Sequence, residues 1–314
     1  MRLAVLLVAL VVLPSLAHAQ AVRIVVPFPP GGAPDALARL ISPKLGEHLG
    51  AGVVIDNRPG ANGIIAAENV MKSAPDGTSL FLADTSHYGI NPALRANLPY
   101  APLKDFVPVI EATKSQLFFT VGAAVPANSL QELVALSKSR PDGLHYGSSG
   151  SGSVAHLAME LLRLHSGGNF VHVPYKGVAQ VVPAVLAGDV AVVTSGPAAL
   201  LGHHRAGKVR MLATVNPERW PGLPEIPTAP EAGFPGVRMD ISIGLLAPAG
   251  TPKDAVRRLN DAAARALRAP EVSGKLSGAG LEVIAGTPEQ FEQAIRRQLE
   301  DYAGLVKASG AKVD

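Results

Sequence analysis

Four stretches of small and hydroxyl-bearing residues follow β-rich runs in this sequence. They are residues 28–35 (FPPGGAPD), 83–89 (ADTSHYG), 146–156 (YGSSGSGSVAH) and 194–198 (TSGPA). They offer hydroxyl groups and unshielded backbone N–H groups, but few charged side chains. Such groups at the start of a helix bind anions, because the first N–H groups of a helix have no partner within it and lie at the positive end of its dipole. The pattern predicts a site for a small anion.

The first stretch combines stiffness with a bare main chain. Prolines end an apolar run, Gly31 and Gly32 follow, and Asp35 stands in the first turn of a predicted helix. Proline restricts the backbone, and glycine lets a ligand approach the main chain closely. We interpret Asp35 as a capping group and dipole partner, because a carboxylate would oppose the binding of an anion.

The serine-rich stretch matches no stricter motif. Residues 147–151 (GSSGS) end in serine and so are not a GxSxG nucleophile elbow, and Ala155 stands where GxGxxG requires its last glycine. No GK[ST] follows, which excludes a P-loop. What remains is a glycine-serine turn with Ser153 as the expected N-cap. The stretch is longer than a cap requires, so we favour ligand contact over a plain capped turn.

Other chemistries have weak support. There is no cysteine, and the nine histidines show no metal-ligand spacing, so neither a metal nor a cofactor is expected. Ser86, His87 and Asp84 could be drawn as a triad, but sequence neighbours rarely have the required mutual geometry. Tyr175 and Lys176 follow a strand, where a solvated turn and ligand contact are equal alternatives.

The elements that must position these stretches alternate between strand and helix. β-rich runs such as residues 22–27, 52–57 and 78–84 are each followed by a helical run, which predicts α/β blocks with parallel-rich sheets flanked by helices. Pro43 is expected to kink or shorten the first helix. Residues 217–236 form a long irregular crossing, and helices at 252–267 and 288–307 complete the chain.

We expect two lobes with a hinged cleft between them. The boundaries predicted are 20–121 with 243–314 for the first lobe and 122–242 for the second, and the chain should cross near residues 121–124 and 242–247. In α/β proteins small ligands bind beyond the carboxyl ends of the strands and between lobes. All four stretches should therefore meet in the cleft.

The N-terminus predicts export. Arg2, an apolar run at residues 3–13 and an A-x-A site at residues 17–19 form a signal peptide covering residues 1–19, and the apolar run is too short for a membrane span of about 20 residues. The formal net charge is +3 with no basic stripe, which favours neither nucleic acid nor an anionic membrane as partner. We expect a soluble protein in a Gram-negative periplasm.

Several long motifs together resemble one family. They include VVPFPPGGAPDALAR, VIDNRPGANGIIAAENV, YGSSGSGSVAHLAMELL, HVPYKGVAQVVPAVLAGDV and LPEIPTAPEAGFPG, and they run from about residue 22 to the C-terminus. In this order they look like the Bug family of TctC-like proteins, the extracytoplasmic solute receptors of tripartite tricarboxylate transporters.

The resemblance implies a two-lobed type II periplasmic binding protein fold that closes on a small carboxylated solute without catalysis. It also implies a monomer that meets membrane transporter subunits transiently, with no cofactor or metal. The family's binding roles fall on Phe28, Pro30, Gly31, Gly32, Thr85, Ser86, Ser148, Ser149, Gly150, Ser151, Ser153, Thr194 and Ser195.

Two departures from the family pattern affect the expected ligand. Ser242 and Ile243 stand where the family commonly has tryptophan and another aromatic residue. After AGDV the family commonly has phenylalanine followed by Asp or Asn, whereas this chain reads AVVTSGPA, with Thr194 and Ser195. The usual dicarboxylates therefore do not carry over directly. Two other functions stay open: a ligand-sensing receptor for a signalling partner, and an exported hydrolase using Ser86 or Ser149.

Overall fold

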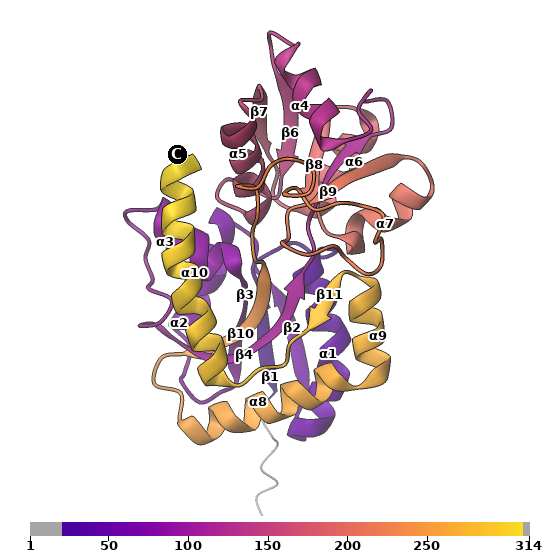
Figure 1. Cartoon of the computed structure of the whole chain (residues 1–314). Coiled ribbons are helices and arrows are strands. Elements are labelled where there is room, and N and C mark those ends of the chain that lie inside the picture. Colours follow the sequence, from indigo (N-terminus) through magenta and orange to yellow (C-terminus); the bar gives the residue numbers. More distant parts are fainter. Residues whose placement is uncertain (1–20, 310–314) are drawn as a thin grey trace, which may run out of the picture.

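The chain folds around two β-sheets, each covered by helices on both faces (Figure 1). The structure is a computed structural model, and it describes residues 21–309. The predicted signal peptide lies outside these residues. Within them, no helix combines the length and the apolar character needed to cross a membrane.

The first sheet has the strand order β11-β4-β10-β3-β1-β2. Its strands are β1 (Val22–Val26), β2 (Val53–Asn57), β3 (Ser79–Asp84), β4 (Phe106–Ser115), β10 (Ser242–Pro248) and β11 (Leu281–Val283). β1 is parallel to β2 and β3, whereas β10 is antiparallel to β3 and β4, and β11 is antiparallel to β4.

Helices bury both faces of this sheet. Leu37, Ile41 and Leu45 of α1 (Ala33–Leu49) share one apolar cluster with α8 (Lys253–Arg268) and α9 (Pro270–Gly278). The opposite face is covered by α2 (Ile64–Met71) and the first part of α10 (Pro288–Ser309), with the short α3 (Asn91–Leu94) beside α10. Leucine, isoleucine and alanine at helical spacing provide the buried stripes.

The second sheet has the order β7-β6-β8-β5-β9. Its strands are β5 (Phe118–Gly122), β6 (Leu144–Ser148), β7 (Phe170–Pro174), β8 (Val192–Ser195) and β9 (Val209–Thr214). One face packs on α4 (Leu130–Lys138) and α5 (Val154–Ser166), and the other on α6 (Val178–Ala187) and α7 (Pro197–Arg205). The two-lobed α/β class predicted from the sequence is confirmed.

The sheets are mixed, which corrects the expectation that they would be rich in parallel pairs. Four of the nine strand pairings are parallel. β5 enters the second sheet and β10 enters the first directly from the other lobe, without an intervening helix. Each of these strands therefore runs antiparallel to both of its neighbours. β4 was not among the predicted strands, and it pairs with both β10 and β11.

Pro43 does not end α1 early, so of the two predicted effects shortening does not occur. The helix continues to Leu49, with Ile41 and Leu45 buried on either side of the proline. Pro43 itself is exposed, so the Arg39 carbonyl that loses its partner lies on the water-facing side. Packing of the buried stripe outweighs the missing hydrogen bond.

The crossings between the sheets lie just before the segments predicted for them at residues 121–124 and 242–247, and the second crossing contains the irregular stretch predicted at residues 217–236. The chain passes from β4 to β5 through Gln116 and Leu117, and it returns between β9 and β10 through residues 215–241. Asn216 joins the two crossings: its Oδ1 accepts from the Leu117 N–H (3.0 Å) and its Nδ2 donates to the Ser115 carbonyl (2.9 Å). The predicted segments belong instead mostly to β5 and to β10.

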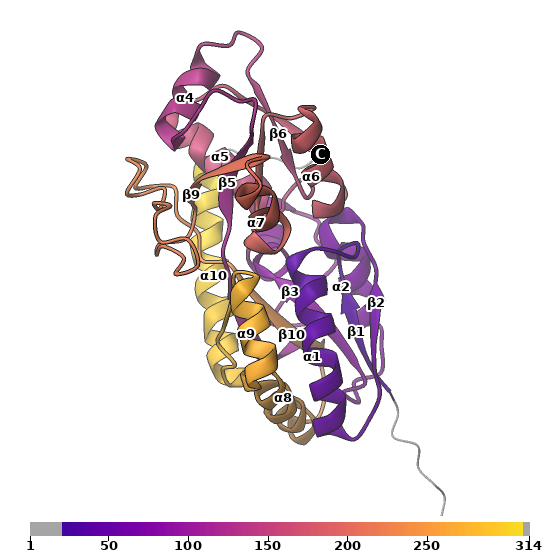
Figure 2. The same cartoon turned by 90° about the vertical axis from the view of Figure 1, so that its right-hand side faces the viewer.

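α10 forms a third connection between the lobes. Phe291 and Ile295 belong to a core cluster of the first sheet, whereas Tyr302 and Val306 belong to the main cluster of the second. Figures 1 and 2 show α10 running along both lobes, beside α5 in the second. We propose lobe boundaries of about 21–116 with 242–298 for the first lobe and 117–241 for the second, with the end of α10 lying on the second.

Candidate functional site

A cavity lies between the lobes and is lined from both. Phe28, Gly32 and Asp84 come from the first lobe, and Ser149 and Thr194 from the second, together with Ser115 and Ile241 near the crossings. Its volume is about 70 Å³, several times the roughly 10–15 Å³ that one water molecule requires by the same measure. The cavity is therefore large enough for a small ligand.

The beginnings of four helices line this cavity. α1, α5, α6 and α7 each contribute residues of their first turn, namely Ala33, Pro34, Val154, Ala155, Val178, Ala198 and Ala199. The N–H groups of Ala33, Ala155 and Val178 make no hydrogen bond outside their helices in the part of the chain described. Four helix dipoles thus present their positive ends to one space, and no lysine, arginine or histidine lines it.

Only some residues of the first stretch, residues 28–35, line the cavity. Phe28 and Gly32 line the cavity, whereas Pro30 and Gly31 are exposed and do not. Asp35 accepts hydrogen bonds from the Gly31 N–H (3.1 Å), Arg39 (2.9 Å) and Asn57 (3.0 Å). Burial would raise the pKa of Asp35, but these hydrogen bonds lower it overall. Asp35 stands in the first turn of α1, as predicted for a dipole partner, but no side chain caps this helix at Gly32, so the predicted capping role is not observed.

The second stretch contributes an unexpected residue. Asp84 at the end of β3 lines the cavity, while Thr85 and Ser86 are buried and do not. Thr85 Oγ1 donates to Gln298 Oε1 (2.9 Å) and accepts from the Ser242 N–H (3.0 Å). Residues Ser86–Ile90 form a π-helical turn, which turns these hydroxyl groups toward the protein.

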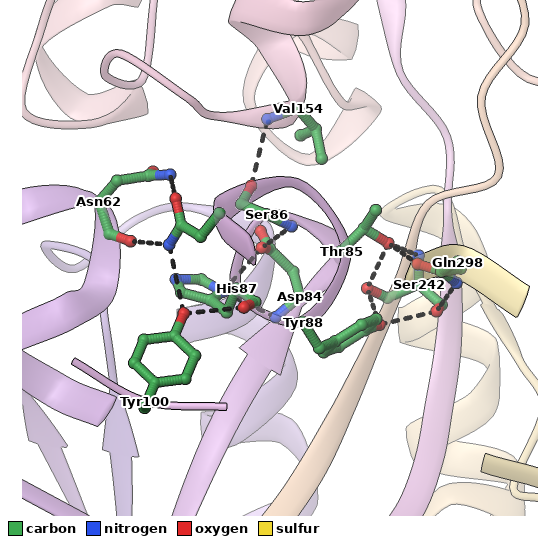
Figure 3. A network of polar contacts seen from close by, with 11 residues as sticks. Asn62, Asp84, Thr85, Ser86, His87, Tyr88, Tyr100, Val154, Ser242 and Gln298 are labelled. Carbon is green, nitrogen blue, oxygen red and sulfur yellow. Dashed lines mark hydrogen bonds and ion pairs between the residues drawn. The ribbon is translucent and has the colours of Figure 1, made fainter. Parts of the chain in front are cut away.

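Figure 3 shows that this turn is the centre of a polar network. Ser86 Oγ accepts from the Val154 N–H of the opposite lobe (3.1 Å). On the other side, the Tyr100 hydroxyl donates to the His87 carbonyl (2.7 Å), and Asn91 links Tyr100 to Asn62. Thr85 and Ser86 therefore fix the wall of the cavity, and Ser86 also links the two lobes.

The serine-rich stretch places one side chain at the cavity. Ser149 lines it, but Ser148, Gly150, Ser151 and Ser153 do not. Ser153 Oγ accepts from the His156 N–H (3.3 Å), so the predicted N-cap is confirmed. Ser148 Oγ lies 2.6 Å from His172 Nε2 and 3.1 Å from the Gly150 N, which holds the turn in shape.

Two stacked imidazoles support this turn from behind. The rings of His156 and His172 are 4.1 Å apart with an interplanar angle of 15°, and Tyr146 stacks on His172 at 5.0 Å. Burial lowers the pKa of both histidines, and for His172, where His156 adds to the effect, the pKa is about 4. Both rings are therefore neutral at pH 7.

The fourth stretch supplies an unpaired hydroxyl. Thr194 and Ser195 line the cavity, as the predicted site required. Thr194 is buried, and its Oγ1 has no hydrogen-bond partner within residues 21–309. Buried polar atoms are rarely left unpaired in proteins, and this hydroxyl is available to bond a molecule in the cavity. Ser242 and Ile243 also depart from the family pattern. Ile243 lines the cavity, whereas Ser242 is hydrogen-bonded to Tyr88.

Neither a metal centre nor a catalytic triad is formed by the described residues. They contain no cluster of three or more His, Cys, Asp or Glu residues that could hold a metal ion. Ser86 Oγ bonds to the Val154 N–H rather than to His87, while His87 Nδ1 faces Asp84 (2.8 Å). Tyr175 and Lys176 do not line the cavity.

Residues 37–311 match the family model of the tripartite tricarboxylate transporter family receptor. The chain belongs to this receptor family. It is 35% identical over 90% of its length to a UPF0065 protein of a Pseudomonas species, of which it covers 84%. It is 33% identical over 94% of its length to protein BugT of Bordetella pertussis, of which it covers 91%.

Solved structures of similar proteins share the fold of this receptor. The periplasmic binding protein BugD is 30% identical with a TM-score of 0.88, at 93% and 98% coverage of the two chains. An R. palustris protein with adipate is 34% identical (TM-score 0.89, 93% and 98% covered). MatC from Rhodopseudomonas palustris with bound malate is 32% identical (TM-score 0.87, 91% and 98% covered).

Proposed function

We propose that this receptor captures a small carboxylate-bearing solute in the cavity between its lobes. The observation that carries the proposal is the meeting of four helix N-termini around a cavity without cationic side chains. Hydrogen bonds from neutral donors to a charged acceptor are about twice as strong as those between neutral groups. A carboxylate can be held in this way without a buried counter-charge.

Binding is coupled to closure of the lobes. A ligand between Gly32 of the first lobe and Ala155 and Thr194 of the second contacts both. It binds the closed arrangement better than an open one and shifts the population toward it. The closed form is then recognised by the subunits of a tripartite tricarboxylate-type transporter in the membrane. Two similar proteins with adipate and malate support the class of solute.

The protein acts in the periplasm as a monomer, without cofactor or metal, after residues 1–19 are removed. A hydrolytic role has less support. Neither Ser86 nor Ser149 has a hydrogen bond to a histidine among the described residues. Ser148, which contacts His172, does not line the cavity.

A thermal-shift screen tests the binding proposal. Purified protein is heated with mono-, di- and tricarboxylates and with amino acids. A ligand at 100 times its Kd stabilises the folded state by about 2.7 kcal/mol, which raises the Tm by roughly 4–5 °C for a chain of this size. Absence of any shift with every carboxylate contradicts the proposal.

The transporter and sensor roles differ in cells. Deletion of the gene should abolish uptake of the solute found in the screen if the partner is a transporter. Normal uptake with loss of a transcriptional response to that solute would instead assign the protein to signalling.

A further inference from the structure

One carboxyl group lines a cavity whose other lining side chains are all uncharged. Asp84 is the last residue of β3, is 6% exposed and contributes to the cavity wall. No lysine, arginine or histidine lines the cavity to balance it. A carboxylate ligand in contact with Asp84 would be repelled, so this side chain requires a different kind of partner.

The two oxygens of Asp84 have different surroundings. Oδ1 accepts from the Ser86 N–H (2.8 Å) and lies 2.8 Å from His87 Nδ1. That nitrogen is also 3.0 Å from the Asp84 backbone N, so it either accepts from the N–H or donates to the carboxylate. In both cases Oδ1 is the oxygen engaged, and the side chain is held in place.

Oδ2 is the open atom. It has no hydrogen bond to any residue in the described part of the chain. Thr194 Oγ1 and His87 Nε2 also lack a partner, but they are fully buried, whereas Oδ2 of Asp84 is not among such fully buried atoms and so keeps some accessible surface. Because Asp84 is otherwise enclosed and lines the cavity, Oδ2 faces the space that a ligand would fill.

We infer that Asp84 is a specificity-determining residue whose Oδ2 accepts a hydrogen bond from the solute, and that the solute is a carboxylate carrying a hydroxyl or ammonium group. The inference rests on the proposed function. A ligand that fills the cavity without such a donor removes water from Oδ2 and leaves this oxygen without a hydrogen bond. This cost is what lets a polar site discriminate strongly against ligands that lack the matching donor. The helix N-termini bind the carboxylate of the solute, and Asp84 accepts a hydrogen bond from its hydroxyl or ammonium group.

Matched sets of ligands test this inference. Titration calorimetry on the purified protein compares propionate, L-lactate and L-alanine, then succinate, L-malate and L-aspartate, then adipate, 2-hydroxyadipate and 2-aminoadipate. Members of a set differ only in the group on one carbon atom. In whichever set binds, a member with a donor should bind at least tenfold more tightly than the member without one, and the preferred member identifies hydroxyl or ammonium.

Variants assign the preference to one side chain. Asp84→Asn should reduce the discrimination to less than threefold, whereas Asp142→Asn, at an exposed position of the second lobe, should leave it unchanged. If the wild-type protein binds the donor-free member as tightly as its partners, the inference is wrong and the receptor function stands. If no carboxylate binds, the proposed function fails as well. The wild-type comparison decides even if Asp84→Asn does not fold.

Discussion

The hydroxyl of Ser86 in the first lobe accepts a hydrogen bond from the backbone N–H of Val154 in the second, with the two atoms 3.1 Å apart. Val154 is the first residue of α5, so its N–H has no acceptor within the helix. The bond therefore satisfies a helix N-terminus and links the lobes beside the cavity (Figure 3).

Removing this hydroxyl should weaken ligand binding by destabilising the closed arrangement. A hydrogen bond of this kind contributes about 0.5–1.5 kcal/mol, so Ser86→Ala should raise the Kd roughly twofold to tenfold. Calorimetric titration with a ligand from the thermal-shift screen measures the effect.

Ser139→Ala is the matched control, because Ser139 is an exposed serine at the end of α4. An unchanged Kd in Ser86→Ala would show that the bond between the lobes does not contribute to closure.

Two buried threonines allow a sharper comparison. Thr194 Oγ1 and Thr113 Oγ1 both lack a hydrogen-bond partner within residues 21–309, but only Thr194 lines the cavity. Replacing each by valine removes an unsatisfied group and should raise the free energy of unfolding by up to about 1 kcal/mol. Thr194→Val alone should also weaken ligand binding, by about tenfold. Equal affinities of the two variants would place Thr194 Oγ1 outside the binding site.

Local signals allowed parts of the site to be predicted from sequence. Ser153 is an N-cap because serine before an apolar helical run is the common way to satisfy the first N–H groups. Each of the four small-residue stretches contributes at least one residue to the cavity, because each follows a strand and precedes a helix. The order of strand-like and helical runs predicted the two-lobed arrangement, and the family resemblance implied the same fold.

Side-chain direction could not be predicted in the same way. Thr85 and Ser86 were expected to contact ligand, but the π-helical turn directs them into the wall and leaves Asp84 at the cavity. Ser115 and Ile241 line the cavity because the chain crosses between the sheets there, which depends on the antiparallel return of β10. No pattern within either segment indicates that position.

Gly32 can be tested as part of the binding surface. It is buried at the N-cap of α1, and an added Cβ would meet only Pro34 Cδ, at 3.7 Å. Gly32→Val therefore leaves space for the fold, with a loss of about 1 kcal/mol because valine caps helices poorly. The branched side chain should cover the main chain and weaken ligand binding at least tenfold.

Gly202→Val controls for the added bulk, since a Cβ on Gly202 in α7 meets nothing within 4 Å and this residue does not line the cavity. Similar affinity of Gly32→Val and the wild type would remove this turn from the site.

The stacked pair of His156 and His172 should make stability depend on pH between about 4 and 6.5. Both rings have a lowered pKa in the folded protein, about 4 for His172, compared with 6.5 for an ordinary histidine. As the pH falls through this range, the unfolded chain binds protons that the folded protein does not, so stability decreases. Above pH 6.5 the contribution is fully present. The lowered carboxylates Asp35 and Asp56 act below about pH 4, outside this range. Burial raises the pKa of Glu111 above its usual 4.5, which opposes the histidine effect within the range, so the difference between wild type and a histidine variant isolates the pair.

Denaturant unfolding at pH 7.5 and pH 5.0 measures this effect. Because His172 is only partly buried, solvent screening reduces its contribution, and we expect a loss on the order of 1 kcal/mol in the wild type. His172→Gln keeps a side chain able to bond Ser148 but does not titrate, so its loss over the same interval should be smaller. His145→Gln, at an exposed position in β6, should behave like the wild type. If His172→Gln loses as much stability as the wild type, the stacked pair is not the cause of the acid sensitivity.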